Sequence, residues 1–216
     1  MAYSGEFGPI ENSITVTFEE KAGTVPILIK HRPGQLLLCE LKAPEHLTLG
    51  KTVSRRLLAS AVSLDADDIV TKTHSPQEAS VGLPFLFAEL TNRTALERAR
   101  IVMDGLDAIV EADITPDVFL YTYSNGEFDI SARMFEHLGG VPEDPATGSA
   151  NCALAGLLGH YNDLASGNFH WRIAQGVEMG RSSLLEARSE KSKGRVVATW
   201  VGGNSVLVGE GFIETD

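Results

Sequence analysis

Residues 150–158 are apolar or small on nearly every side of a helix, and this segment constrains the fold more than any other. It reads Ala-Asn-Cys-Ala-Leu-Ala-Gly-Leu-Leu. A helix with this pattern has no face that prefers water, so other elements must enclose it. Segments typical of strands precede and follow it, at 128–135 and 169–174. We therefore predict an α+β fold in which a sheet wraps around one central helix.

Several other segments carry the periodicity of strands and helices. Residues 13–19 alternate between apolar and polar side chains, as a half-buried strand does. Strands at 24–30 and 35–41 would follow it, after the breaks at Ala22-Gly23 and Pro33-Gly34, and complete an antiparallel meander. Hairpin turns are predicted at 124–126 and 202–204. The remaining predicted elements are strands at 82–90, 118–123, 128–135, 169–174, 184–187, 196–201 and 206–213, and helices at 53–63 and 94–105.

The composition restricts the class of protein. The chain has 216 residues, 43% of them hydrophobic, which suits one large or two small globular domains. With 18 basic and 29 acidic residues, its net charge is −11, and this argues against nucleic acid and membrane surfaces as partners. We expect neither a membrane-spanning helix nor a secretory signal, because no apolar run is long enough and residues 1–6 lack a basic and an apolar region. The two cysteines, Cys39 and Cys152, are fewer and farther apart than in a secreted disulfide framework, so we expect a cytoplasmic protein. We interpret both as small buried hydrophobes.

Two adjacent carboxylates, Glu143 and Asp144, stand before a Pro/Gly turn that opens into the apolar helix. Neighbouring side chains on an extended segment point in opposite directions, so one should face a site and the other should anchor the loop. We favour Asp144 as the acid/base group, because Pro145 fixes the backbone after it and a helix start follows. The alternative is that Asp144 only caps the turn and the helix.

The residues that open the helix, Thr147, Gly148 and Ser149, could form a cradle for an anion. Free backbone N–H groups at a helix start attract carboxylates and phosphates, and a glycine lets a ligand approach the backbone. The alternative is an ordinary serine cap next to a glycine turn. These three residues are the predicted substrate-binding residues.

Other common sites lack their residues. The chain has no Gly-Lys-Ser/Thr phosphate loop, no Gly-x-Ser-x-Gly elbow, no His-Glu-x-x-His and no Cys-x-x-Cys. Its six histidines lack ligand spacing, although His137 lies close enough to the motif to line a cleft. The acidic residues in 64–69 suit a capped turn better than a metal loop. We therefore expect neither a metal nor a cofactor.

Residues 143–150, Glu-Asp-Pro-Ala-Thr-Gly-Ser-Ala, resemble the signature of the phenazine-biosynthesis PhzF-like family, which has the diaminopimelate epimerase fold. The resemblance extends from about residue 14 onward. The supporting segments, in chain order, are 22–25, 82–85, 132–135, 175–181, 202–203 and Gly209.

The resemblance implies two pseudo-symmetric halves, each a curved, mostly antiparallel sheet around a central helix, with the site between them. Residues 51–203 would form the complete second half, and residues 1–50 the remainder of the first, joined by a C-terminal strand at 204–216. The implied activity is cofactor-free proton transfer that isomerises a small carboxylate in a homodimer. Asp144 matches the family's aspartate, and Gly148 with Ser149 matches its substrate-contacting helix start.

The N-terminal segment of the family has no counterpart in this sequence. That segment contains a Gly-Asn-Pro strand, the glutamate regarded as the main acid/base, a Gly-His-Pro motif and the first central helix; residues 2–3 resemble the tail of that helix. We expect the first sheet to expose an apolar face, which a longer reading frame or a second copy would cover. The alternative function is a non-catalytic module that binds small anions or proteins. Glu136-His137 also differs from the apolar residue and proline usual in the family.

Overall fold

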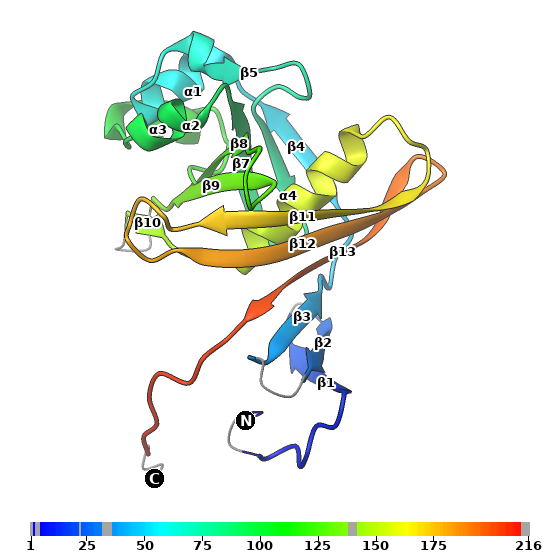
Figure 1. Cartoon of the computed structure of the whole chain (residues 1–216). Coiled ribbons are helices and arrows are strands. Elements are labelled where there is room, and N and C mark those ends of the chain that lie inside the picture. Colours follow the sequence, from blue (N-terminus) through cyan, green and yellow to red (C-terminus); the bar gives the residue numbers. More distant parts are fainter. Residues whose placement is uncertain (1, 3–4, 22, 32–35, 138–141, 213–216) are drawn as a thin grey trace.

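The computed structural model describes residues 2, 5–21, 23–31, 36–137 and 142–212. The predicted turn at Pro33-Gly34, the break at Ala22 and the resemblance at Tyr3 lie outside these residues. The molecule is an α+β protein in which one long mixed sheet bends around a single helix, with smaller helices gathered at one end (Figure 1).

The strands form one sheet in the order β1-β2-β3-β13-β12-β11-β9-β8-β7-β6-β4, with β10 beside β9 and β5 beside β7. Every pairing in the described residues is antiparallel except β7 with β8 and β9 with β11. The strands are β1 (Ser13–Glu20), β2 (Gly23–Lys30), β3 (Leu38–Lys42), β4 (Thr48–Thr52), β5 (Ile69–Val70), β6 (Gln77–Ser80), β7 (Pro84–Leu90), β8 (Val118–Tyr123), β9 (Ile130–Phe135), β10 (Glu143–Asp144), β11 (Gly167–Gln175), β12 (Ser183–Ser192) and β13 (Arg195–Asn204).

The predicted central helix is confirmed as α4 (Gly148–Tyr161), and residues 150–159 are all buried. It packs against β13, β12, β11, β7 and β6, so strands surround it (Figure 1). Two glycines permit this close packing. A Cβ at Gly156 would come 2.9 Å from the Leu47 side chain, and one at Gly159 would collide with Ser189. The helix is thus the centre of the main core.

A second core lies between the other face of β7 and β8 and the small helices. These are α1 (Arg55–Val62), α2 (Arg93–Arg98) and α3 (Met103–Glu111), with a short 3-10 turn, η1 (Ala66–Asp68). The prediction of a helix at 53–63 is confirmed, and so is the capped acidic turn, where the Asp65 N–H donates to Asp68 Oδ2 at 3.0 Å.

The single helix predicted at 94–105 is wrong. Helix α2 ends at Arg98, and α3 begins at Met103. Residues 99–102 between them are not helical. The N–H groups of Arg100 and Val102 donate instead to carbonyls in the last turn of α1, Val62 O and Ala61 O. Tertiary hydrogen bonds therefore outweigh the local apolar period.

The strand predicted at 206–213 is also wrong, since residues 205–212 contain no strand. Residues 202–204 belong to β13 and make no hairpin. Gly202 serves a different purpose: a Cβ there would lie 2.7 Å from Cys39 O, so the glycine lets β13 run close beside β3. The hairpin turn that joins β12 to β13 lies at Lys193-Gly194, both with positive φ.

Strand β13 joins β1–β3 to the rest of the sheet, because it pairs with β12 along one edge and with β3 along the other. The Arg188 guanidinium supports this junction. It donates to Glu40 at 2.7 and 2.9 Å and lies 3.7 Å from the Trp200 ring centroid. The division of the chain at residue 50 stays a prediction.

Cross-strand register places Val16, Ile27 and Leu41 on one face of this part of the sheet, through the pairs Val16–Ile27 and Ile27–Leu41. Phe18 belongs to the same face and is 39% exposed, whereas Ile29 is buried. The predicted apolar face therefore exists and is partly open among the described residues.

We predict that His74 lowers the free energy of unfolding at acidic pH. This residue is buried, with Nε2 2.8 Å from the Tyr121 hydroxyl and Nδ1 2.7 Å from Ser75 O. Burial lowers the pKa of His74, so in acid the unfolded chain binds a proton at this residue that the folded chain does not bind. The free energy of unfolding should fall below about pH 6.5, by at most about 1.4 kcal/mol per pH unit from this group.

Urea titrations between pH 5 and 8 would measure this slope in the wild type and in His74→Gln, with the exposed His46→Gln as the control. His74→Gln should flatten the dependence on pH, and His46→Gln should not. An identical slope in all three proteins would contradict the assignment.

Candidate active site

The two adjacent carboxylates separate, as the sequence predicted, with one of them anchoring the loop. Glu143 accepts from Arg133 at two atoms, Nε at 2.8 Å and Nη2 at 2.7 Å. Arg133 is 4% exposed, and its Nη1 donates to Leu96 O and Ala99 O at the end of α2. Glu143 thus fixes β10 against β9 and α2, and Asp144 is left for another role.

The half-buried side chain of Asp144 turns toward the start of α4. Its Oδ2 accepts the Thr147 hydroxyl at 2.6 Å. Within the part of the chain that the structure describes, it accepts no backbone N–H of α4, so the simple capping alternative does not describe its contacts. The alternative of a Ser149 cap is wrong, because Thr147 is the N-cap residue and the helix begins at Gly148.

Gln175, at the end of β11, ties this turn together from the interior. Its Nε2 donates to Asp144 O at 2.7 Å and to Thr147 Oγ1 at 2.9 Å. Its Oε1 accepts from Thr147 N at 3.2 Å and from Asn151 Nδ2 at 2.7 Å. The next residue, Gly176, has φ +77°, and a Cβ there would meet Pro145 at 2.8 Å. Gln175 therefore holds the Asp144 loop by hydrogen bonds, and Gly176 allows that loop to pack closely against it.

The start of α4 presents unpaired backbone donors. Asn151 N donates to Thr147 O, but the N–H groups of residues 148–150 have no acceptor among the described residues. The Thr147 hydroxyl, which would ordinarily cap such a helix, is bonded to Asp144 and Gln175 instead. Ala150 is fully buried, so the donors open to a ligand are those of Gly148 and Ser149. At the positive end of a 14-residue helix they suit an anionic group.

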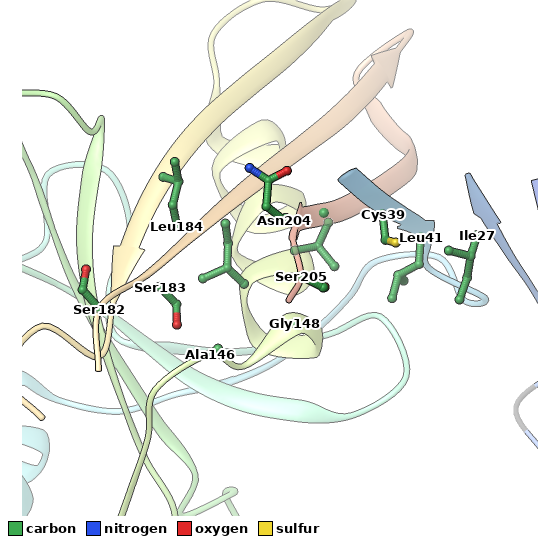
Figure 2. A pocket seen from close by; sticks show the side chains of 14 residues that line it. Ile27, Cys39, Leu41, Ala146, Gly148, Ser182, Ser183, Leu184, Asn204 and Ser205 are labelled. Atoms are coloured by element: carbon green, nitrogen blue, oxygen red, sulfur yellow. The ribbon is translucent and has the colours of Figure 1, made fainter. Parts of the chain in front are cut away.

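A cavity of about 450 Å³ opens at this helix start. Figure 2 shows Cys39 and Leu41 of β3 on one side of Gly148, and Ser183 and Leu184 of β12 on the other. The walls thus combine aliphatic side chains with hydroxyl and backbone polar groups. A small molecule with an anionic end and an apolar body would match them.

The predicted site residues differ in their relation to this cavity. Gly148 lines it, whereas Asp144, Thr147 and Ser149 do not. Ser149 is exposed in the first turn of α4, and its hydroxyl has no partner among the described residues. Asp144 and Thr147 precede the first residue of α4, and a hydrogen bond joins their side chains.

Glu136 is a titratable residue near Asp144 that the site prediction did not include. Burial raises its pKa, and the negative charges of Asp144 and Asp117 raise it further. The sequence feature that could have indicated Glu136 is that Glu136-His137 departs from the family pattern. His137 does not line the cavity at the start of α4.

Burial disfavours the thiolate form of both cysteines. Cys152 is 1% exposed, and burial raises its pKa to about 11, although its Sγ donates to Thr199 Oγ1. Burial also raises the pKa of Cys39. The prediction of a buried hydrophobe is confirmed for Cys152, whereas Cys39 is only partly buried. The described residues contain no cluster of three potential metal ligands and no helix fit to span a membrane.

Comparison with known proteins gives consistent matches. The family described as "Phenazine biosynthesis-like protein" matches residues 3–211. A trans-2,3-dihydro-3-hydroxyanthranilate isomerase of Pseudomonas aeruginosa is 30% identical over 89% of this chain and 65% of its own length. An uncharacterized isomerase of Mesorhizobium japonicum is 29% identical over 89% of this chain and 66% of its own length. The chain thus spans about two thirds of these curated relatives.

Among solved structures, a predicted epimerase of Pseudomonas aeruginosa is 27% identical and superposes with a TM-score of 0.75. The match covers all of this chain and 72% of that protein.

We predict that Glu143→Gln destabilises the protein by roughly 3 kcal/mol, because it leaves the buried Arg133 without its counter-charge. The control is Glu97→Gln, whose half-exposed carboxylate pairs with Arg93 four residues earlier on α2 and should cost about 0.5 kcal/mol. Urea denaturation of both variants measures the difference. Equal losses would show that the Arg133 pair does not anchor the loop.

Proposed function

This chain belongs to the phenazine biosynthesis-like family, and we propose that it is an isomerase that moves a proton on a small carboxylate without a cofactor. The observation that carries the proposal is the placement of Asp144 against a helix start with three unpaired N–H groups. The relatives named as isomerases support the same reaction class. Because the chain spans about two thirds of those relatives, the activity of the whole protein is part of the proposal.

In this proposal the N–H groups of Gly148 and Ser149 and the Ser149 hydroxyl bind the substrate carboxylate. The rest of the substrate occupies the cavity, against aliphatic side chains such as Leu41 and Leu184. Asp144, in the loop that precedes the helix start, contacts the substrate. Thr147, expected to bind substrate, acts through its hydroxyl on Asp144, and as the N-cap it orients the neighbouring donors.

The chemistry is a proton shift that conserves every atom. The Asp144 carboxylate takes a proton from one position of the bound substrate, and the electron pair left behind moves to the neighbouring bond. The carboxylic acid then returns the proton at a second position, which yields the isomer and restores the carboxylate. The helix start stabilises negative charge on the substrate carboxylate during the transfer.

The wider arrangement is part of the same proposal. The fold would be that of diaminopimelate epimerase, with two halves and the site between them, and the cavity at the junction of β3, β12, β13 and α4 agrees with that placement. A homodimer in the cytoplasm completes the proposal.

A second candidate is a module that binds small carboxylates without turnover. One observation favours it: the cavity at the helix start is lined by Gly148 but not by Asp144. Binding and turnover must therefore be measured separately.

We predict that Asp144→Asn lowers turnover by about 10² to 10⁴-fold, the range for losing a general acid/base. The assay would follow trans-2,3-dihydro-3-hydroxyanthranilate in D₂O, where proton transfer incorporates deuterium. Asp163→Asn, in the exposed loop after α4, serves as the control and should retain turnover. Thermal melts would confirm that both variants fold.

Unchanged turnover in Asp144→Asn would exclude its acid/base role. If the wild type binds anthranilate but turns over no probe, the binding module becomes the better description.

A further inference from the structure

The hydrogen bonds around Asp144 have a defined direction. Gln175 Nε2 donates to Thr147 Oγ1 at 2.9 Å, and Thr147 Oγ1 donates to Asp144 Oδ2 at 2.6 Å. We infer that Gln175 and Thr147 form a one-way relay that holds Asp144 as a hydrogen-bond acceptor, so that it enters the proposed reaction as the base. This inference rests on the proposed function for its catalytic meaning, but the relay can be tested without turnover.

The orientation of the Gln175 amide follows from its neighbours. Its Nε2 faces Asp144 O, a carbonyl that can only accept. Its Oε1 faces Thr147 N and Asn151 Nδ2, which can only donate. Asn151 is fixed in the same way, because its Nδ2 also donates to Thr147 O at 2.8 Å. Exchanging the oxygen and nitrogen of Gln175 would break every one of these bonds.

The fixed amide then decides where the single hydroxyl proton of Thr147 points. Because Oγ1 accepts from Gln175, its own hydrogen is available for the remaining neighbour, Asp144 Oδ2. The short distance of 2.6 Å suits an O–H donor bonded to a carboxylate. A proton on Oδ2 would face the hydroxyl hydrogen, so the relay opposes protonation of this oxygen.

The other oxygen of the carboxylate remains available for chemistry. Among the described residues, Asp144 Oδ1 has no hydrogen-bond partner. The relay is also shielded from water, since Gln175 is 0% exposed and Thr147 is 8% exposed. Hydrogen bonds in such surroundings are stronger and more directional than at the surface. Thr147 and Gln175 are thus positioning residues, and the proton is taken up at Oδ1.

The first test follows the Asp144 carboxyl by ¹³C NMR at neutral pH, with the signal assigned by its loss in Asp144→Asn. The variant Thr147→Val keeps the shape of the side chain and removes the hydroxyl that donates to Oδ2. Its carboxyl signal should therefore move away from the wild-type position. Thr147→Ser retains the hydroxyl and should give a signal close to that of the wild type. A carboxyl signal that does not differ between Thr147→Val and Thr147→Ser would overturn the relay.

The second test reverses the donor at the start of the relay. In Gln175→Glu a carboxylate oxygen replaces the amide nitrogen, so the Thr147 hydroxyl should turn toward residue 175 and away from Asp144. The Asp144 carboxyl signal should then move as it does in Thr147→Val. If Gln175→Glu fails to fold in a thermal melt, the Thr147→Val and Thr147→Ser pair decides the question alone. If it folds and gives the wild-type signal, Gln175 does not direct the hydroxyl and the inference fails.

Kinetics separates the relay from the proposed function. With trans-2,3-dihydro-3-hydroxyanthranilate as the probe, Thr147→Val should lower kcat about tenfold or more at neutral pH and leave KM nearly unchanged. Thr147→Ser should recover most of the rate. A carboxyl signal that moves in Thr147→Val, in a protein without turnover, would support the relay and reject the isomerase. Normal kcat in Thr147→Val would overturn the catalytic role of the relay.

Discussion

The buried amide of Gln175 is the contact on which the candidate site depends. It joins β11 to the loop that follows β10, and it satisfies both the Asp144 carbonyl and the Thr147 N–H in the interior. Leaving such groups unpaired away from water would be costly, so the turn has little freedom to take another shape. The same amide keeps the Thr147 hydroxyl from capping α4, and the helix start therefore retains its donors.

The rest of the fold brings these parts together. Helix α4 has its position fixed by burial on all sides, with glycines where strands approach most closely. Strand β13 carries the sheet past the start of α4 to β3, where Gly202 allows the backbones to come near. Glu143 and Arg133 hold the opposite side of the loop. Packing, strand pairing and one buried ion pair thus converge on a single short turn.

The sequence was sufficient for features that depend on local pattern. The enclosed helix, the first meander and the opposite roles of Glu143 and Asp144 could all be predicted, because each follows from periodicity or from adjacent residues. Features that depend on distant partners could not. Gln175 lies 28 residues from Thr147, and the break after α2 depends on hydrogen bonds to α1. In the sequence, the glycines at 202–203 resemble a turn. Only the pairing of β13 with β3 shows that they belong to a strand.

The most direct test of the account is whether a carboxylate binds at the open start of α4. ¹⁵N NMR of the labelled protein, titrated with anthranilate, would report on each backbone amide separately. The account predicts that the largest saturable shifts occur at Gly148 and Ser149, whose N–H groups have no acceptor among the described residues. Saturable shifts confined to another part of the chain, with these amides unchanged, would contradict it.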